Sequence, residues 1–345
     1  MEANATSAWV PQFPPKRDAL AIVVPVTVIY VAIFVTGVAG NVVTVIVIWR
    51  CRCMHTPTNY YLMSLAVSDL LLLLSGLPQE VYSIWIRYPY PFGGAFCVLR
   101  GLAAETSANA SVLTITAFTV ERYLAICKPF QTATRAQAPS RRHRVFKVIA
   151  GVWAAALLCA GIQAMQFGVM VTDILGRQVP LCAQVRVLLS HSFEAATLVF
   201  FAAPMTLMCV LYALIASRLH RQRKEAVGHS TPSSLRHVAA KKRVIKMLAA
   251  VVTAFFLCWA PFHAQRLVAI HAGGAVGPGL FDGLTYVSGV LHYVSATVNP
   301  ILYQLMSRKF RQAGKDTLAG LLPNLAWSVR RRASRHHPHG PRCGS

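Results

Sequence analysis

Two glutamates, Glu80 and Glu105, interrupt long apolar stretches of the chain and are its clearest candidates for binding chemistry. The chain has 11 acidic residues in all, and only two others, Asp69 and Glu121, lie within such stretches away from the loops. An ionisable side chain is costly to place at membrane depth, so it marks a functional site by default. Glu80 and Glu105 are therefore expected to act together on a ligand.

The spacing places these two carboxylates at compatible depths. Glu105 follows Cys97 by eight residues, which is about 12 Å along a helix. Glu80 follows Asp69 by eleven residues, about 16 Å further along, and the helical period returns it to within about 20° of the Asp69 face. Two carboxylates that converge in one cavity suit a cation. A guanidinium fits better than a monoamine because it can be gripped bidentately from two sides.

A second set of candidates recurs at i, i+3, i+4 and i+7, which is one face of a helix: Trp259, Phe262, His263 and Arg266. Core packing alone would also explain the aromatic members. Arg266 could pair with Glu105 as a structural salt bridge, because an unpaired buried charge is expensive, and a ligand arginine could then exchange for it. The sequence offers Glu80 no comparably placed basic partner.

The elements that position these residues are long and apolar. The chain is 55% hydrophobic and 13% charged, with a mean hydropathy of +0.49, whereas a soluble domain has about a quarter charged residues. A membrane-spanning helix needs about 20 apolar residues. Seven runs qualify: Leu20–Trp49, Asn59–Trp85, Ala95–Cys127, Val145–Gly168, Val187–Ala216, Val244–Ile270 and Leu280–Met306. This pattern predicts an all-α integral membrane protein, a bundle of seven transmembrane helices.

Charge distribution sets the expected orientation. The net charge is +23, which in a soluble chain would suggest a nucleic-acid partner. Most Lys and Arg, however, fall on alternate connections, the signature of cytoplasmic loops, so no nucleic-acid partner is expected. These connections are residues 50–55, 128–147, 218–246 and 308–345.

The expected organisation follows. Residues 1–19 form an extracellular tail with a glycosylation sequon at Asn4, residues 20–306 the bundle, and residues 307–345 a cytoplasmic amphipathic helix and basic tail. Among nine cysteines, only Cys97 and Cys182 face the oxidising side, so we expect them to form a disulfide rather than remain free thiols.

Short motifs on five of these apolar runs resemble those of a known protein family. They are Asn41, Asp69, "VERYLAICKP" with Glu121, Arg122 and Tyr123, "FFLCWAPFH" with Trp259 and Pro261, and "NPILY" with Asn299, Pro300 and Tyr303. In this order on seven spans, they closely resemble the rhodopsin-like family of G-protein-coupled receptors, over roughly Leu20 to Phe310.

The resemblance implies roles for these residues. Glu121 would hold Arg122 in the inactive state, although the pair could also be a simple ion pair at the membrane edge. The prolines would let the sixth and seventh helices switch between two arrangements. The resemblance implies a sodium ion as the only cofactor. In the family this ion lies in a polar network that includes an oxygen-rich pair of residues, and this chain has Ser295 and Ala296 in place of that pair. That network comprises Asn41, Asp69, Ser111, Ser295 and Asn299.

"CWAPFHAQRL", "LPQEVY" and Glu105 together resemble the neuromedin U, pyrokinin and CAPA peptide receptors. Ligands of that group end in Pro-Arg-X-amide, and the resemblance implies that this arginine lies between Glu80 and Glu105. Gq with phospholipase C, arrestin, receptor kinases and membrane lipids are the partners implied, at the plasma membrane. The ligand site would comprise Glu80, Glu105, Phe262, His263, Arg266, Tyr286 and Tyr293.

Other functions fit less well. Ghrelin, motilin and neurotensin receptors are the alternative; the first two share the Glu105 position, so Glu80 discriminates. Amine receptors carry an aspartate where this chain has Ala104, and a retinal pigment needs a lysine that the seventh run lacks. Lipid receptors are more uniformly apolar in this region. A transporter would need repeated halves, and an enzyme a nucleophile–base pair or metal-ligand spacing; neither is present in the sequence.

Overall fold

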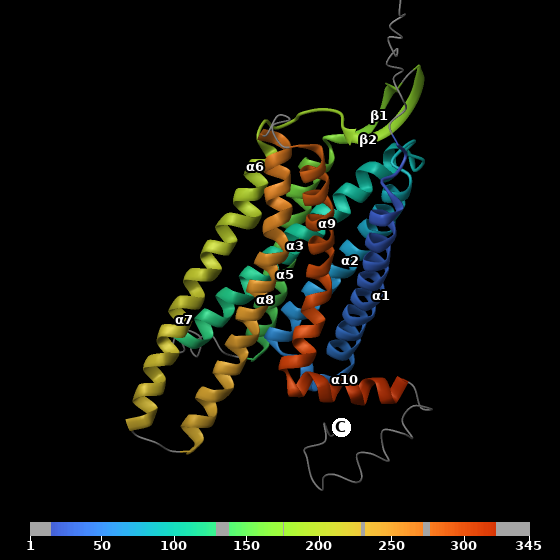
Figure 1. Cartoon of the computed structure of the whole chain (residues 1–345). Helices are drawn as coiled ribbons and strands as arrows, with labels where there is room; N and C mark the ends of the chain where they lie inside the picture. Colours follow the sequence, from blue (N-terminus) through green and yellow to red (C-terminus); the bar gives the residue numbers. More distant parts are fainter. Residues whose placement is uncertain (1–14, 129–137, 175, 229–231, 272–276, 322–345) are drawn as a thin grey trace, which may run out of the picture.

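The computed structural model describes residues 15–128, 138–174, 176–228, 232–271 and 277–321, and long helices dominate it (Figure 1). The helices are α1 (Leu20–Arg50), α2 (Pro57–Trp85), α3 (Gly93–Cys127), α5 (Ala138–Ala164), α6 (Ser192–Thr197), α7 (Ala203–Gly228), α8 (Pro232–His271), α9 (Pro278–Met306) and α10 (Arg308–Leu321). A short 3₁₀-helix, η1 (Arg52–Met54), follows α1, and a π-helical turn, η2 (Leu198–Ala202), joins α6 to α7. The Asn4 sequon and the tail beyond residue 321 lie outside the described residues.

Six of the described helical segments are long and apolar enough to cross a membrane: α1, α2, α3, α5, the α6–α7 rod and α8. Their outward faces carry exposed apolar side chains such as Val28 and Leu158. The helix α9 is less apolar because it buries polar groups, among them His292 and Asn299, but it packs against α1, α2 and α8. The expected seven-helix bundle is confirmed.

The helix α10 runs across one end of the bundle (Figure 1). It begins after Ser307, whose Oγ accepts a hydrogen bond from the Phe310 N–H at 3.2 Å. Phe310 and Ala313 are buried, whereas Lys309 and Lys315 are exposed. This division is the amphipathic pattern expected of a helix on a membrane surface.

Prolines shape several of the helices. Pro57 occupies the first turn of α2, where its missing N–H costs nothing, and the Thr56 hydroxyl caps the same turn. Pro204 cannot donate to the carbonyl four residues earlier. The turn just before it, η2, is π-helical, with the Ala203 N–H bonded to the Leu198 carbonyl. Pro261 and Pro300 lie inside α8 and α9.

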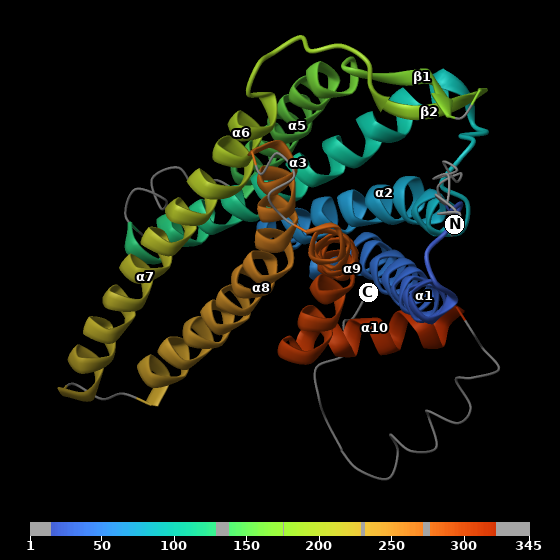
Figure 2. The same cartoon turned by 45° about the horizontal axis from the view of Figure 1, so that its top comes forward.

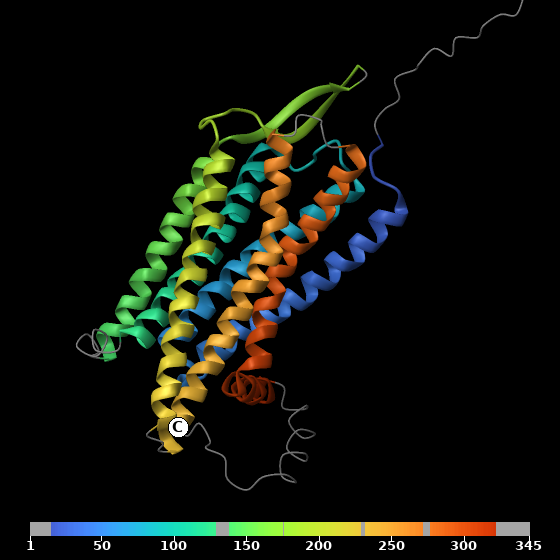
Figure 3. The same ribbon diagram turned by 60° about the vertical axis from the view of Figure 1, so that its left-hand side comes forward.

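A β-hairpin lies at the opposite end of the bundle from α10 (Figure 3), beside the end of α3 (Figure 2). Its strands, β1 (Phe167–Ile174) and β2 (Arg177–Gln184), pair antiparallel with Val169 opposite Cys182. The helix expected over Val145–Gly168 therefore ends early, at Ala164, and that prediction was wrong for its last residues. The β-branched residues of β1 favour the extended conformation, and Gly176 supplies a turn residue with φ of 77°.

Buried polar contacts join the helices. The Asn41 side chain donates to the Ala296 carbonyl at 2.8 Å and so links α1 to α9. The Trp153 indole donates to Ser64 at 3.0 Å, linking α5 to α2. Each bond satisfies a polar group that would otherwise be costly inside an apolar bundle.

Gly37 is the most tightly packed glycine of α1. A Cβ atom there would lie 2.7 Å from Leu73 Cδ1 of α2 and 2.8 Å from Thr297 Cγ2 of α9. We expect Gly37→Ala to destabilise the bundle, because the buried side chains of Leu73 and Thr297 would have to shift or the helices move apart; overpacking of this kind costs about 1–3 kcal/mol. The purified protein in detergent should show a lower melting temperature in a thermal-shift assay.

Gly161→Ala is the matched control. Gly161 lies in α5, and a Cβ atom there would meet nothing within 4 Å. This change should leave the melting temperature unaltered or raise it slightly, because alanine is the better helix former. Equal melting temperatures for the two variants would contradict the close packing at Gly37.

Candidate functional site

A cavity opens at the hairpin end of the bundle, between α2, α3, α5, α8 and α9. Its volume is about 300 Å³, at the lower end of the range for ligand pockets. That volume accommodates one or two side chains of a ligand rather than a folded partner. Phe167 of the hairpin contributes to its wall, as does Phe193 of α6.

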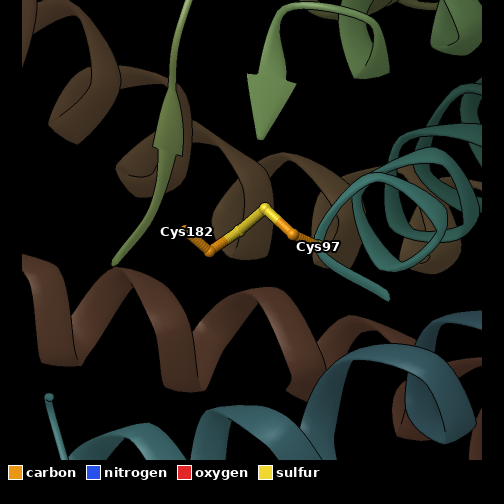
Figure 4. Close-up of a disulfide and its surroundings, with 2 residues drawn as sticks. All are labelled: Cys97 and Cys182. Atoms are coloured by element: carbon orange, nitrogen blue, oxygen red, sulfur yellow. A yellow bond between two sulfur atoms is a disulfide. The ribbon is translucent and has the colours of Figure 1, made fainter. Parts of the chain in front are cut away.

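A disulfide between Cys97 of α3 and Cys182 of β2 fixes the hairpin beside this cavity (Figure 4). The two Cα atoms are 5.8 Å apart, within the usual range for the bond, and both residues line the cavity. The predicted pairing is confirmed. The disulfide thus holds both the hairpin and the end of α3 in place.

Glu105 and Arg266 form an ion pair across the cavity, with 2.9 Å between Oε1 and Nη2. The guanidinium also lies over two aromatic rings, 4.4 Å from the centroid of Phe262 and 5.4 Å from that of Phe193. Cation–π contacts of this kind add to the attraction of the carboxylate. Arg266 is therefore held by three groups on three elements, α3, α6 and its own helix α8.

Glu80 also has a basic partner, and the expectation that it lacks one was wrong. Arg100 of α3 reaches it across the α2–α3 boundary, with 3.2 Å between Nη2 and Oε2. Arg100 and Glu105 are five residues apart, about 140° around α3. The two side chains consequently diverge, Arg100 toward α2 and Glu105 toward α8, although both line the cavity.

Aromatic rings form the inner wall of the cavity. Trp259 stacks on Phe255 at 5.1 Å between centroids and meets the edge of His292 at 4.7 Å. His292 in turn stacks on Phe262 at 4.5 Å. His263 bonds Thr197 through Nδ1 at 3.1 Å. The four residues predicted to share one face of the sixth membrane-spanning helix, which is α8, thus all line the cavity.

Of the two tyrosines predicted to bind ligand, both in α9, the structure places one in the cavity and the other at its rim. Tyr293 lines the cavity, but Tyr286 is absent from its described lining. The Tyr286 hydroxyl instead donates to Asp18, which also pairs with Arg87 just beyond α2. Tyr286 precedes Tyr293 by two helical turns, so it lies at the rim, where it ties α9 to the segment before α1.

A second, smaller cavity of about 10 Å³ lies deeper in the bundle, enough for about one water-sized particle. Asp69 lies in its wall and accepts a hydrogen bond from the Asn299 amide at 2.9 Å. Ser111 and Ser295 also line it, whereas Asn41 bonds elsewhere. A carboxylate and two hydroxyls are ligands that a small hard cation accepts. Among the described residues, no group of three or more His, Cys, Asp or Glu is arranged to hold a metal ion.

Near the α10 end, Glu121 binds Arg144 of α5, with 3.0 Å between Oε2 and Nη2. This partner was not expected from the sequence. The Arg122 guanidinium lies 5.6 Å from the Phe118 ring. Tyr123 packs on a buried cluster of Ile126, Ile215 and Leu219 from α3 and α7, and Tyr303 is buried beside Phe310.

The sequence analysis missed several cavity residues, among them four whose contacts shape the site: Arg100, Phe193, Thr197 and His292. Arg100 carried a usable signal, because it follows Cys97 by less than one turn on the helix that bears Glu105. His292 adjoins Tyr293, but a histidine in an apolar run gives no direction by itself. Whether Phe193 and Thr197 of α6 reach the cavity depends on where the α6–α7 rod begins, and hydropathy does not define that position.

Comparison with known proteins agrees with this architecture. The model of the seven-transmembrane receptors of the rhodopsin family matches residues 40–303. The pyrokinin-1 receptor of Drosophila melanogaster is 48% identical, over 89% of this chain and 82% of that protein. Neuromedin-U receptor 2 of Mus musculus is 38% identical, over 95% and 81%. Growth hormone secretagogue receptor type 1 of Sus scrofa is 38% identical, over 87% and 85%.

Breaking the Glu105–Arg266 pair from one side is expected to destabilise the protein more than removing it from both. Glu105→Gln or Arg266→Gln alone leaves a partly buried charge without its partner, which costs about 1–3 kcal/mol. The double variant should recover part of that loss. Melting temperatures of the purified single and double variants would measure the coupling.

Arg186→Gln is the control for this cycle, because Arg186 is exposed on the segment after the hairpin. It should leave the melting temperature close to that of the unmodified protein. Additive losses from the Glu105 and Arg266 changes would show that the pair contributes nothing to stability.

Proposed function

The chain belongs to the rhodopsin family of seven-transmembrane receptors and is a peptide receptor rather than an enzyme; from this premise we propose that its ligand is an amidated peptide ending in Pro-Arg-X-amide. The proposal rests on one observation. Two carboxylates line the same cavity, and each is bound to an arginine of the chain itself. Carboxylates that already hold guanidinium groups have the geometry to hold the ligand's guanidinium in exchange. The pyrokinin-1 and neuromedin-U receptors among its relatives support the same ligand class.

The peptide's C-terminus enters at the hairpin end, where Phe262, His263 and Tyr293 surround it. Trp259 lines both this cavity and the deeper polar one, so a ligand that moves the indole also alters the contacts of α9. Pro261 and Pro300 interrupt the backbone ladders of the two helices that respond.

The response opens the α10 end for a heterotrimeric G protein of the Gq class, which activates phospholipase C. There Glu121 releases Arg122, and arrestin and receptor kinases act on the same surface. The protein lies in the plasma membrane with residues 1–19 outside, glycosylated at Asn4, residues 20–306 spanning, and residues 307–345 inside. The basic connections then face the anionic inner leaflet.

A ghrelin-type or neurotensin-type peptide is the second candidate ligand. The 38% identity to a growth hormone secretagogue receptor favours it, and such a ligand could use the Glu105–Arg266 pair without needing Glu80. The two candidates therefore differ in whether Glu80 contributes to binding.

Cells that express the receptor should release calcium when challenged with Pro-Arg-X-amide peptides. Glu80→Gln and Glu105→Gln should each raise the EC50 about 10- to 100-fold, because each removes a charge-assisted hydrogen bond to the ligand's arginine. A citrulline analogue keeps the shape of arginine without its charge, and it should be affected much less.

Ghrelin-type and neurotensin-type peptides belong in the same assay. A response to one of these with silence toward every Pro-Arg-X-amide would refute the ligand assignment. Equal losses for the arginine and citrulline peptides would mean that the two glutamates only support folding.

We also propose that the deeper cavity holds a sodium ion when the receptor is at rest, bound by Asp69, Ser111 and Ser295. The ion would supply a positive charge that keeps Asp69 ionised and the cavity compact. Replacing sodium chloride with choline chloride should then raise agonist affinity, and Asp69→Asn should abolish the difference. Identical affinities in the two salts would argue against an ion at this site.

A further inference from the structure

We propose that Arg100 is an internal competitor for the ligand's arginine: it occupies the guanidinium subsite at Glu80 in the empty receptor and yields it to the peptide. This inference rests on the proposed ligand class and names the regulation of the same site. It makes Arg100 a residue that sets both affinity and the preference for a guanidinium.

Charge in the cavity requires an exchange. The lining contains two carboxylates, Glu80 and Glu105, and two guanidiniums, those of Arg100 and Arg266, already paired across it. A third guanidinium that entered would find both carboxylates in use. It can gain a full ion pair only by displacing one of the resident arginines, and the more weakly held of the two will be displaced.

The two resident arginines are held unequally. Arg266 has a 2.9 Å contact with Glu105 and lies over the rings of Phe262 and Phe193. Arg100 has a longer contact with Glu80, at 3.2 Å, and a hydrogen bond with the Tyr293 hydroxyl, so one carboxylate and one uncharged group hold it. Its Nε is buried and makes no hydrogen bond to any described residue.

The disulfide fixes the backbone near Arg100 but not the Arg100 side chain, which is 26% exposed. Cys97, three residues earlier, ties this end of α3 to the hairpin, so release of Glu80 need not move the helix. The displaced guanidinium keeps five N–H donors, and water can satisfy them because the side chain is 26% exposed. Its release from Glu80 therefore leaves no donor without a partner and adds no contact with the ligand.

The size of the effect follows from the exposure of the pair. The side chains of Arg100 and Glu80 are 26% and 33% exposed, and partly exposed ion pairs are weak. A competitor of that strength lowers apparent affinity about two- to fivefold, because only the fraction of receptors with Glu80 vacant can bind.

Binding of a labelled Pro-Arg-X-amide peptide to membranes tests the inference. Arg100→Gln should lower the Kd about two- to fivefold, and Arg100→Met should do the same if the glutamine variant does not reach the cell surface. The gain should disappear in a Glu80→Gln background, where nothing is left to compete for. A citrulline analogue should show no gain with Arg100→Gln.

Arg266→Gln is the matched comparison, since it removes the same charge from the same cavity but frees Glu105 and leaves Arg100 on Glu80. Glu80→Gln should therefore not cancel the effect of Arg266→Gln. A gain by Arg100→Gln that persists with Glu80→Gln would point to general electrostatics instead of competition at Glu80 and would overturn the inference. So would unchanged or weaker binding by both Arg100 variants. Failure of every such peptide to bind the unmodified receptor would overturn the proposed function itself, and the inference with it.

Discussion

A carboxylate inside an apolar helix bundle has to find a partner, because water is not there to solvate its charge. Four acidic residues lie within the bundle away from the helix ends, and each meets this requirement on a different helix from its own. The pairs are Asp69 with Asn299, Glu80 with Arg100, Glu105 with Arg266, and Glu121 with Arg144. They join α2 to α9, α2 to α3, α3 to α8, and α3 to α5. The arrangement of the bundle therefore depends on contacts that a competing charge can alter.

These pairs differ in what can reach them. Asp69 and Glu121 are buried, and a peptide at the hairpin end touches neither. Glu80 and Glu105 line the open cavity, and Trp259 borders both that cavity and the one containing Asp69. A cation that rearranges the outer pairs is thus separated from the inner polar network by a single indole ring. Because packed interiors shift between discrete arrangements rather than deforming smoothly, a small displacement of this ring can be passed to α9.

Hydropathy, charge and short motifs predicted the bundle, the disulfide and the cavity face of α8, since each depends on a strong local pattern. The hairpin was not predicted, because the apolar residues that begin β1 continue the hydrophobicity of α5 past Ala164. The Arg100 pair was also missed. Its formation depends on how α2 and α3 approach each other, and a sequence gives the face of a residue but not the reach of its side chain. Tyr286 illustrates the same limit: it lies on the same helix as Tyr293, yet two turns place it at the rim beside Asp18.

Charge neutrality in the cavity has a further consequence for selectivity. A net negative site would attract any cation. A site whose carboxylates are already paired binds a ligand favourably only if the ligand replaces the ion pairs that it breaks. An ammonium group could neutralise Glu80, but it cannot reproduce the planar, two-pronged contact of a guanidinium with a carboxylate. An apolar side chain would break an ion pair without forming a new one. On the proposed ligand assignment, discrimination in favour of arginine would therefore arise from the resident arginines as much as from the glutamates, because an entering group has to replace the contacts that the resident arginines make.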